Sequence, residues 1–320
     1  MTESSRTDVV FVEVPLFDLA DAELVVEEAA AAPVVAAAPA AAAPAAPTLV
    51  APPVVAAPPA RVAQPSVVEA DAVPMAFEGA PVAVETRPRP AWADRLAVFD
   101  LETTGIDVET SRVVTANISL LDAAGEPVRR RDWLADPGVA IPEQATAVHG
   151  ITTAHAQAEG RPAAEVVAEI VAELRRALDD GYALVVYNAP YDLSLLHHES
   201  LRHGVLPLVA PSPVIDPLVI DKQLDRYRKG KRTLEASSAH YGVSLTDAHD
   251  AGADAIAAGR VAQAIASAFP AELDLDPVQL HAAQHAWHDA QCDSFEDYMR
   301  RVRDPQFTAR RGWPEVPPRP

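Results

Sequence analysis

The sequence has 320 residues but a single cysteine, Cys292, and few basic side chains. One cysteine excludes an internal disulfide and a zinc site built from cysteines, and it fits a reducing cytoplasm. The 26 Lys and Arg residues stand against 46 Asp and Glu residues, which gives a formal net charge of −20 at pH 7. This charge argues against broad, non-specific coating of nucleic acid. It leaves room for an enzyme that binds phosphate through metal ions held by acidic side chains.

No secretion signal is expected either, because the first six residues do not show a basic and then apolar pattern. We therefore expect a cytoplasmic protein. Charged side chains are absent from Ala29 to Ala60, so a membrane span has to be considered there. Eight prolines fall in that stretch, and each one removes a backbone donor and breaks a helix. The stretch is therefore predicted to be an extended spacer.

Composition divides the chain into four parts. Residues 1–28 are acidic and residues 29–90 are rich in Ala and Pro, so both are predicted to be disordered. Residues 91–270 have the composition of a folded domain, and residues 271–320 are predicted to form a C-terminal helix and a basic tail. The segment Val14-Pro15-Leu16-Phe17 has the character of a short docking motif. One interpretation is that the N-terminal tail tethers the chain to a replication or repair protein, and the alternative is a solvated acidic end.

Hydrophobic periodicity predicts strands and helices that alternate along the folded part. The first three strands are close together in the sequence and are expected to form an antiparallel meander. A loop or short-helix region is expected at 141–153. The predicted strands lie at 96–102, 112–121, 127–134, 183–187 and 214–216, and the predicted helices at 163–178, 188–204, 217–227, 233–241, 250–269 and 277–303.

Two acidic residues come together at the end of the first predicted strand. Because side chains alternate between the faces of a strand, Asp100 and Glu102 share one face with Leu96 and Val98. Open α/β sheets place their ligands at this end of the strands. Two residues advance a strand by only ~6.6 Å, so both carboxylates can reach one Mg²⁺ or Mn²⁺ ion. The alternative is a solvated strand end.

Two further carboxylates are predicted to reach the same crevice. Asp192 follows the fourth strand in the first turn of a helix, where the helix dipole alone would also favour an acid. Asp254 lies on the apolar stripe of the long helix, in line with Val261 and Ile265. A bare carboxylate that faces a core is costly unless a cation or a donor meets it. A metal ion shared with Asp100 and a buried salt bridge both remain open.

His249 comes five residues before Asp254, so the two side chains would point about 140° apart on a helix. His249 is therefore expected in the loop that leads into the helix, where it can bend over the acidic cluster. A neutral imidazole in that place can take a proton from water at physiological pH.

These residues together resemble the ordered motifs of the DEDDh 3′–5′ exonucleases, the DnaQ-like family of the polymerase III proofreading subunit. The resemblance covers roughly residues 94–270. One departure is Tyr191, where the family often has Phe before the acidic residue. The segments that carry the resemblance are Phe-Asp-Leu-Glu-Thr-Thr-Gly at 99–105, Val-His-Gly-Ile-Thr at 148–152, Asn-Ala-Pro-Tyr-Asp at 188–192 and His-Asp-Ala-Gly-Ala-Asp-Ala at 249–255.

The resemblance implies an α/β fold of the ribonuclease-H-like type, with a mixed β-sheet flanked by helices. It implies that Asp100, Glu102 and Asp254 bind one Mg²⁺ or Mn²⁺ ion. Asp100 would also bind a second ion, with Asp192 acting partly through water. Two ions ~4 Å apart clamp the attacking and leaving oxygens of an in-line displacement. His249 would then deprotonate the attacking water.

Substrate contacts are expected in two regions. A basic run precedes the His249 segment in this acidic chain, so contact with phosphate is expected there, and a solvated loop is the alternative. Its members are Lys222, Arg226, Arg228, Lys229, Lys231 and Arg232. The contacts that the resemblance implies for the terminal nucleotide and its surroundings are Leu101, Thr103, Thr104, His149 and Asn188.

We therefore expect a metal-dependent 3′–5′ exonuclease that releases nucleoside monophosphates from DNA with a free 3′ end, most simply single-stranded DNA. Its expected role is in DNA replication or repair. An RNA 3′ exonuclease of the same superfamily shares the five catalytic residues and stays open as an alternative. A second alternative is a non-catalytic subunit that uses the exonuclease fold as a docking body and the tail as a tether.

Overall fold

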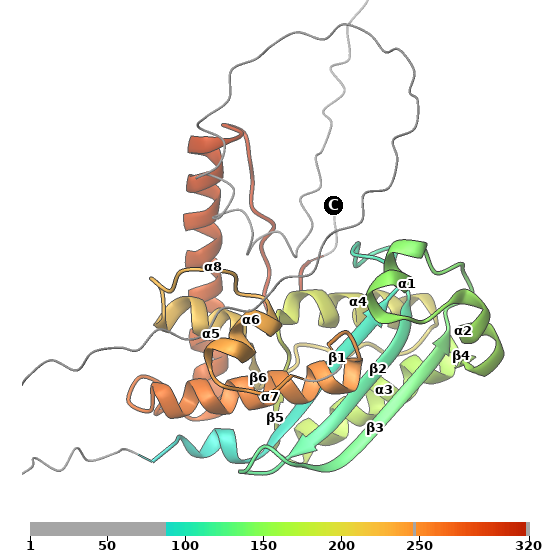
Figure 1. Ribbon diagram of the computed structural model, residues 1–320, viewed down its shortest axis with the longest axis horizontal. Helices are drawn as coiled ribbons and strands as arrows, with labels where there is room; N and C mark the ends of the chain where they lie inside the picture. The colour runs from blue at the N-terminus through green and yellow to red at the C-terminus, as the bar shows by residue number, and fades with distance from the viewer. Residues whose placement is uncertain (1–87, 246–247, 318–320) are drawn as a thin grey trace, which may run out of the picture. The chain divides into compact units, whose positions relative to one another are not determined.

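The structure is a computed structural model that describes residues 88–245 and 248–317. The predictions for the acidic segment, the docking motif and nearly all of the Ala/Pro-rich spacer lie outside the described residues. Within them, a mixed six-stranded sheet carries helices on both faces (Figure 1). This confirms the expected fold class. Among the same residues, no helix combines the length and apolar character that crossing a membrane requires.

The strands are arranged in the order β4–β3–β2–β1–β5–β6. The strands β1 (Leu96–Thr103), β2 (Val113–Leu121) and β3 (Pro127–Asp136) form the predicted antiparallel meander. Beyond β1, the short strands β5 (Ala183–Val185) and β6 (Val214–Ile215) continue the sheet in parallel. The two residues of β4 (Arg161–Pro162) pair with the end of β3. Because β1 and β5 are parallel, the segments that follow them leave the sheet at the same edge.

The helices follow the predicted pattern, with bounds within three residues of those expected. The region expected as a loop or short helix at 141–153 contains the first helix of the series, and the second, which was not predicted, begins where that region ends. The helices are α1 (Glu143–His149), α2 (Thr153–Glu159), α3 (Ala163–Asp179), α4 (Ala189–Arg202), α5 (Pro217–Leu224), α6 (Leu234–His240), α7 (Ala251–Ala268) and α8 (Pro277–Val302), and a 3-10 helix at Ala91–Asp94 precedes β1.

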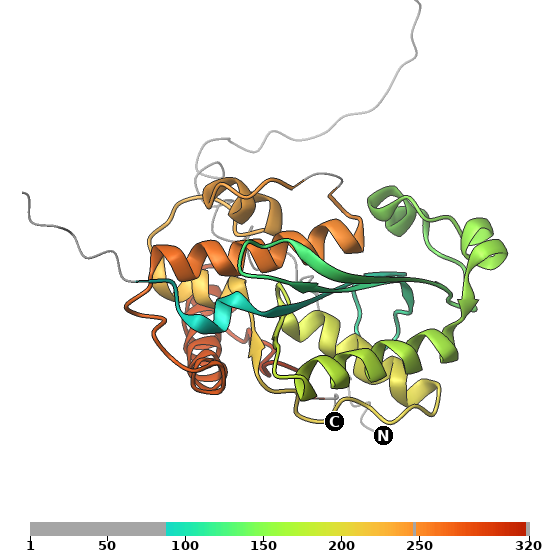
Figure 2. The same cartoon turned by 90° about the horizontal axis from the view of Figure 1, so that it is seen from below.

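The two faces of β1 are buried against different helices. Phe99 belongs to the core cluster on the side of α3 and α4, whereas Leu96 and Val98 pack in the cluster with α7. Figure 2 shows the sheet edge-on, with α7 on one side and α3 and α4 on the other. Asp100 and Glu102 continue the row of Leu96 and Val98, so they face α7.

A close approach at Gly259 brings α7 down onto the sheet. A Cβ atom at this position would lie 2.5 Å from a methyl carbon of Leu121 and 2.5 Å from one of Val98. No larger residue fits without moving the helix away from β1 and β2. Asp254 lies little more than one turn before Gly259. The glycine therefore sets how near this carboxylate comes to the end of β1.

The outer edge of β6 is covered by side chains of α8. Nδ1 of His281 accepts a hydrogen bond from the backbone N–H of Val214 at 3.1 Å. The side chain of Gln284 accepts from the N–H of Asp216 at 2.7 Å and donates to the carbonyl of Val214 at 3.1 Å. Backbone groups that a further strand would use are thus satisfied by one helix.

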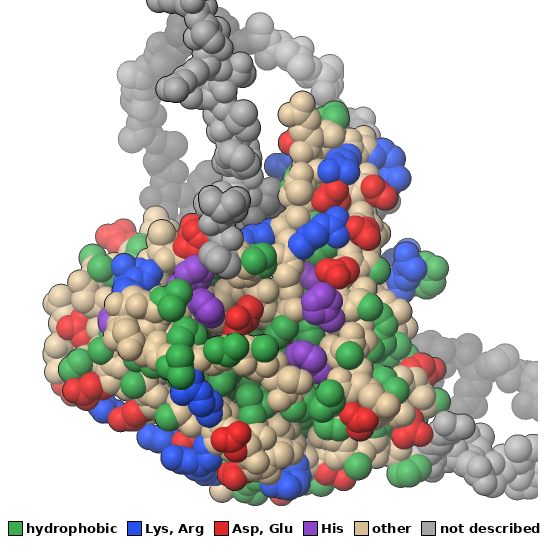
Figure 3. Space-filling model, turned by 180° about the vertical axis from the view of Figure 1, so that it is seen from behind, with side chains coloured by type: hydrophobic (Ala, Val, Ile, Leu, Met, Phe, Trp, Pro, Cys, Tyr) green, Lys and Arg blue, Asp and Glu red, His purple; other side chains and the backbone are tan. Residues whose placement is uncertain are grey.

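After α8 the chain folds back along this helix. The backbone N–H of Ala309 donates to Glu296 at 3.0 Å, and Arg311 pairs with Asp293 at 2.6 Å. The far end of α8 consequently shows acidic and basic side chains side by side (Figure 3). Farther along, Trp313 is buried. The basic tail that was predicted here is therefore packed onto the fold up to residue 317.

Candidate active site

The end of β1 carries the first two acids of the candidate site, Asp100 and Glu102. Between them in the strand, the backbone N–H of Leu101 donates to Oδ1 of Asp192 at 3.1 Å. Asp192 comes from the first turn of α4 and is 4% exposed. The structure thus brings the third predicted carboxylate to the same strand end, and it uses the Leu101 amide for that purpose.

The fourth carboxylate, Asp254, comes from the first turn of α7. Its Oδ2 accepts a hydrogen bond from the backbone N–H of His249 at 3.2 Å, while its Oδ1 is buried without a hydrogen-bond partner. Ligand atoms of Glu102, His249 and Asp254 all lie within 4.8 Å of one another. Among the described residues, no basic side chain forms a salt bridge with Asp254. An unpaired buried oxygen beside other ligands fits a cation site better than the salt bridge that the sequence left open.

The carboxylates raise one another's pKa. Burial raises the pKa of Asp100 well above its ordinary value, and the negative charges of Asp192, Glu102 and Asp254 raise it further. Burial, followed by the charges of Asp254 and Asp192, raises the pKa of Glu102 to about 8. Burial also raises the pKa of Asp192 and Asp254. A divalent cation would relieve this repulsion, and a set of carboxylates suits Mg²⁺ or Mn²⁺.

His249 lies in the turn before α7, as predicted. Its φ of 69° is in the left-handed region, which few non-glycine residues adopt. The next residue, Asp250, caps the helix by accepting a hydrogen bond from the N–H of Ala253 at 2.9 Å. This turn points the exposed imidazole toward Glu102 and Asp254. The strained conformation is held by hydrogen bonds on both sides of the cap.

His149, expected as a substrate contact, lies near the same site. Its Nδ1 accepts a hydrogen bond from the N–H of Ile151 at 3.1 Å, and its Nε2 is buried without a partner. Burial lowers the pKa of His149, the backbone of Thr103 opposes this shift, and the charge of His249 adds to it. These influences come from the end of β1 and from the turn before α7, so the structure brings His149 to both.

Hydroxyl groups of Thr103 and Thr104 are engaged within the protein. The hydroxyl of Thr103 donates to the carbonyl of Gly105 at 2.8 Å and lies 2.5 Å from the hydroxyl of Tyr191. Tyr191 also donates to Gly105, at 2.7 Å. The hydroxyl of Thr104 accepts from the N–H of Arg112 at 2.9 Å. Tyr191, which departs from the family's usual Phe, thus uses its hydroxyl to tie α4 to the loop after β1.

Asp216 is a buried acid whose role was not predicted from the sequence. It accepts hydrogen bonds from the backbone N–H groups of Asn188 and Ala189, both at 3.0 Å, where α4 begins. Asn188, an expected substrate contact, adopts the left-handed conformation at this cap, with a φ of 63°. An Asp before Pro217 at the end of a predicted strand is a helix-start signal, so the cap of α5 was foreseeable. Its second partner, the start of α4, was not.

The basic run needs a correction. Arg228 and Arg232 were expected to contact phosphate, but their side chains are only 8% and 9% exposed. Each pairs with the same carboxylate oxygen of the fully buried Asp221, at 2.6 Å. Their positive charges therefore compensate the negative charge of the buried Asp221. Lys229 and Lys231 lie on the surface of this segment.

Comparison with known proteins agrees with this geometry. A family model, the RNase T exonuclease family, matches residues 97–262, just over half of the chain. A DNA polymerase III PolC-type protein of Lacticaseibacillus paracasei is 30% identical over 190 residues, which are 59% of this chain and 12% of that protein. A DNA polymerase III subunit epsilon-like protein of Rhodobacter capsulatus is 30% identical over 159 residues, 47% of this chain and 20% of that protein. The chain thus spans a fifth or less of these two relatives.

Among solved structures, Exonuclease I of E. coli in complex with a dT13 oligonucleotide is similar to this chain. The TM-score is 0.50 at 19% sequence identity, over 57% of this chain and 43% of that one. At this level of identity the likeness concerns the fold, which is the mixed sheet with its flanking helices.

Proposed function

Because the chain belongs to the RNase T exonuclease family and carries a DnaQ-like exonuclease domain, we propose that it is a metal-dependent 3′–5′ exonuclease. Its proposed substrate is a single DNA strand with a free 3′ end, since the two relatives described above are DNA polymerase III proteins. One observation carries the proposal. Carboxylates from β1, α4 and α7 meet at one strand end, beside a histidine whose ligand atom lies within 4.8 Å of those of Glu102 and Asp254.

The proposed ion ligands are the four carboxylates. Asp100, Glu102 and Asp254 would hold one Mg²⁺ or Mn²⁺ ion, and Asp100 would share a second with Asp192. When bound, such ions stabilise the charge that develops on the attacking and leaving oxygens of the phosphodiester. The amide of Leu101 keeps Asp192 in place before any ligand arrives, so little rearrangement is needed on binding.

His249 is the proposed general base. Its imidazole takes a proton from water, and the water oxygen forms a bond to the phosphorus that links the last two nucleotides. The bond between phosphorus and the 3′ oxygen of the penultimate nucleotide breaks, and this oxygen takes up a proton. The products are a nucleoside 5′-monophosphate and a strand shortened by one residue with a new 3′ hydroxyl. General-base catalysis of this kind contributes ~10²–10⁴-fold to the rate.

The test is an exonuclease assay on single-stranded oligonucleotides that carry a label at the 5′ end. With Mg²⁺ or Mn²⁺ we expect a ladder of labelled products that shorten one nucleotide at a time, and with a chelator no cleavage. A 3′-phosphorylated strand and an RNA of the same sequence are run in parallel. Release of the label as a mononucleotide from the start of the reaction, or no cleavage with either ion, would overturn the proposal. Faster cleavage of RNA than of DNA would make RNA the substrate in place of DNA.

A further inference from the structure

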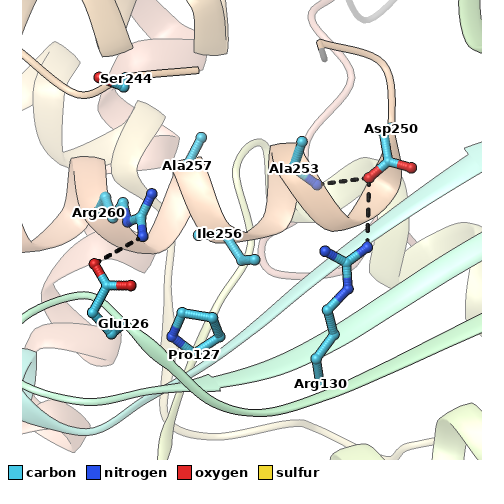
Figure 4. Close-up of a pocket in the computed structure, with 9 residues that line it drawn as sticks. All are labelled: Glu126, Pro127, Arg130, Ser244, Asp250, Ala253, Ile256, Ala257 and Arg260. Atoms are coloured by element: carbon cyan, nitrogen blue, oxygen red, sulfur yellow. Dashed lines mark hydrogen bonds and ion pairs between the residues drawn. The ribbon is translucent and has the colours of Figure 1, made fainter. Parts of the chain in front are cut away.

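A groove of about 500 Å³ lies between α7 and the hairpin of β2 and β3 (Figure 4). Arg130, from β3, stands at the end of the groove next to the candidate site, and its Nη2 lies 3.7 Å from Oδ1 of Asp250. The same oxygen caps α7 through the N–H of Ala253. Asp250 directly follows His249 in the chain. A guanidinium group from β3 therefore contacts the turn that carries the proposed general base.

Arg130 is itself held in place by the sheet. Its Nε and Nη2 both donate to Asp132, at 2.8 Å each, which fixes the plane of the guanidinium group. Asp132 accepts in turn from the side-chain amide of Asn117, at 2.8 Å, and Asn117 is fully buried in β2. Two hydrogen bonds and the 3.7 Å ion pair thus lead from the middle of the sheet to the N-terminus of α7.

The glycine in the first turn of α7 is explained by this contact. A Cβ atom on Gly252 would lie 2.2 Å from Nη2 of Arg130 and 2.7 Å from its Cζ. Gly252 has an ordinary helical backbone, and glycine is a poor helix former, so helix formation alone would favour another residue here. The missing side chain makes the space that the guanidinium group occupies.

We propose that Arg130 is a positioning residue, which through Asp250 holds the turn from His249 to Asp254 in its catalytic arrangement. The inference rests on the proposed exonuclease function. The side chains of Arg130 and Asp250 are 44% and 58% exposed, and ion pairs between such exposed groups add little to stability. Rates depend on position more steeply, because a displacement of ~1 Å can cost ~10²-fold. The contact should therefore matter far more for kcat than for folding.

Because the two residues compete for one space, they can be tested as a pair. Arg130→Ala removes the guanidinium group, and Gly252→Ala displaces it with the added Cβ. We expect each change to lower kcat about 10- to 100-fold and to leave KM for a short DNA strand within about threefold. The double variant should be no slower than the slower single variant, because the same contact is lost only once. Arg130→Lys keeps the charge without the fork, so it should restore little of the rate.

Arg260→Ala is the matched control. Arg260 lies on α7 at the other end of the same groove, where it pairs with Glu126 at 3.2 Å, away from the catalytic turn. This variant should keep the kcat of the wild type. Mn²⁺ titration by calorimetry supplies a readout that needs no catalysis, and the same non-additive pattern is expected in Mn²⁺ affinity. If the wild type binds Mn²⁺ but cleaves no DNA, the proposed exonuclease function is wrong. If the variants then still show the non-additive pattern in Mn²⁺ affinity, the positioning role of Arg130 stands.

Three results would overturn the inference. An unchanged kcat and Mn²⁺ affinity in Arg130→Ala would show that the turn needs no support from β3. Additive losses in the double variant would show that Gly252 and Arg130 act through different contacts. A salt-dependent rise in KM with normal kcat would instead make Arg130 a contact for the phosphates of the strand.

Discussion

Trp313 donates its indole N–H to the carboxylate of Asp216 at 3.3 Å, although the two residues are 97 positions apart. The same carboxylate receives the backbone N–H groups with which α4 begins, and α4 carries Asp192. A residue beyond the part of the chain that matches the family model therefore supports the helix of one candidate ligand.

Trp313→Phe should lower the free energy of unfolding by about 1–2 kcal/mol, because it keeps most of the apolar contact and removes one donor from a buried acid. Chemical denaturation of the two proteins measures the difference. In an Asp216→Asn background the same change should cost less, since the neutral amide depends less on that donor. Equal costs in both backgrounds would show that this hydrogen bond contributes nothing.

Asp100→Asn should abolish cleavage, because Asp100 is the proposed ligand of both ions. The same change should raise the melting temperature of the metal-free protein, since burial and four neighbouring acids raise the pKa of Asp100 and make its charge unfavourable. Turnover within about tenfold of the wild type would contradict the two-ion arrangement.

Stability of the metal-free protein should fall as the pH rises from about 4.5 to about 8. In this window the unfolded chain has lost the proton of Glu102, whose ordinary pKa is 4.5, while the folded chain still holds it because its pKa is about 8. Each pH unit should therefore cost up to ~1.4 kcal/mol for this group. Denaturation across this range, with Glu102→Gln as the comparison, should show a flatter dependence in the variant. Saturating Mg²⁺ should stabilise most at the alkaline end.

His249→Ala should lower kcat by ~10²–10⁴-fold, the usual contribution of a general base. The structure places His249 within ligand distance of Glu102 and Asp254, so the variant also separates two roles. A base leaves Mn²⁺ affinity nearly intact, as measured by calorimetry. A collapse of that affinity would assign His249 as an ion ligand instead.

Arg228→Ala should destabilise the fold by roughly 1.5–3 kcal/mol, because it removes one of the two charged donors to the buried Asp221. Arg232 pairs with the same oxygen and should behave alike. Lys229→Ala, on the exposed part of the same segment, should leave stability unchanged and raise KM for long strands in a salt-dependent way. An unchanged KM would remove this segment from the substrate path.

Much of the site could be predicted because its signals are local. Alternation along one strand was enough to put Asp100 and Glu102 on one face, and helical periodicity was enough to turn Asp254 inward. Both patterns depend on residues a few positions apart. The short loops and single-residue caps then limited how the elements could be connected.

The remainder depends on contacts between distant segments. A run of Lys and Arg has the same sequence whether its side chains meet solvent or a buried acid, so the burial of Arg228 was decided by where Asp221 lies. Glycine within a helix normally destabilises that helix, whereas Gly252 and Gly259 lie where another element comes close to α7. Arg130 belongs to no sequence motif, and its proposed role is visible only because the folded chain brings it close to the start of α7.

The covering of β6 by α8 has a counterpart at the other side of the sheet. There β3 pairs with β4 only at its end, and its remaining length carries Arg129, Arg130 and Arg131 in succession. Consecutive charges on an edge strand oppose docking by a second sheet, just as satisfied backbone groups do. The domain should therefore resist amyloid-like self-association at high protein concentration. Any protein that binds this domain should contact its helices or loops and not add a strand to its sheet.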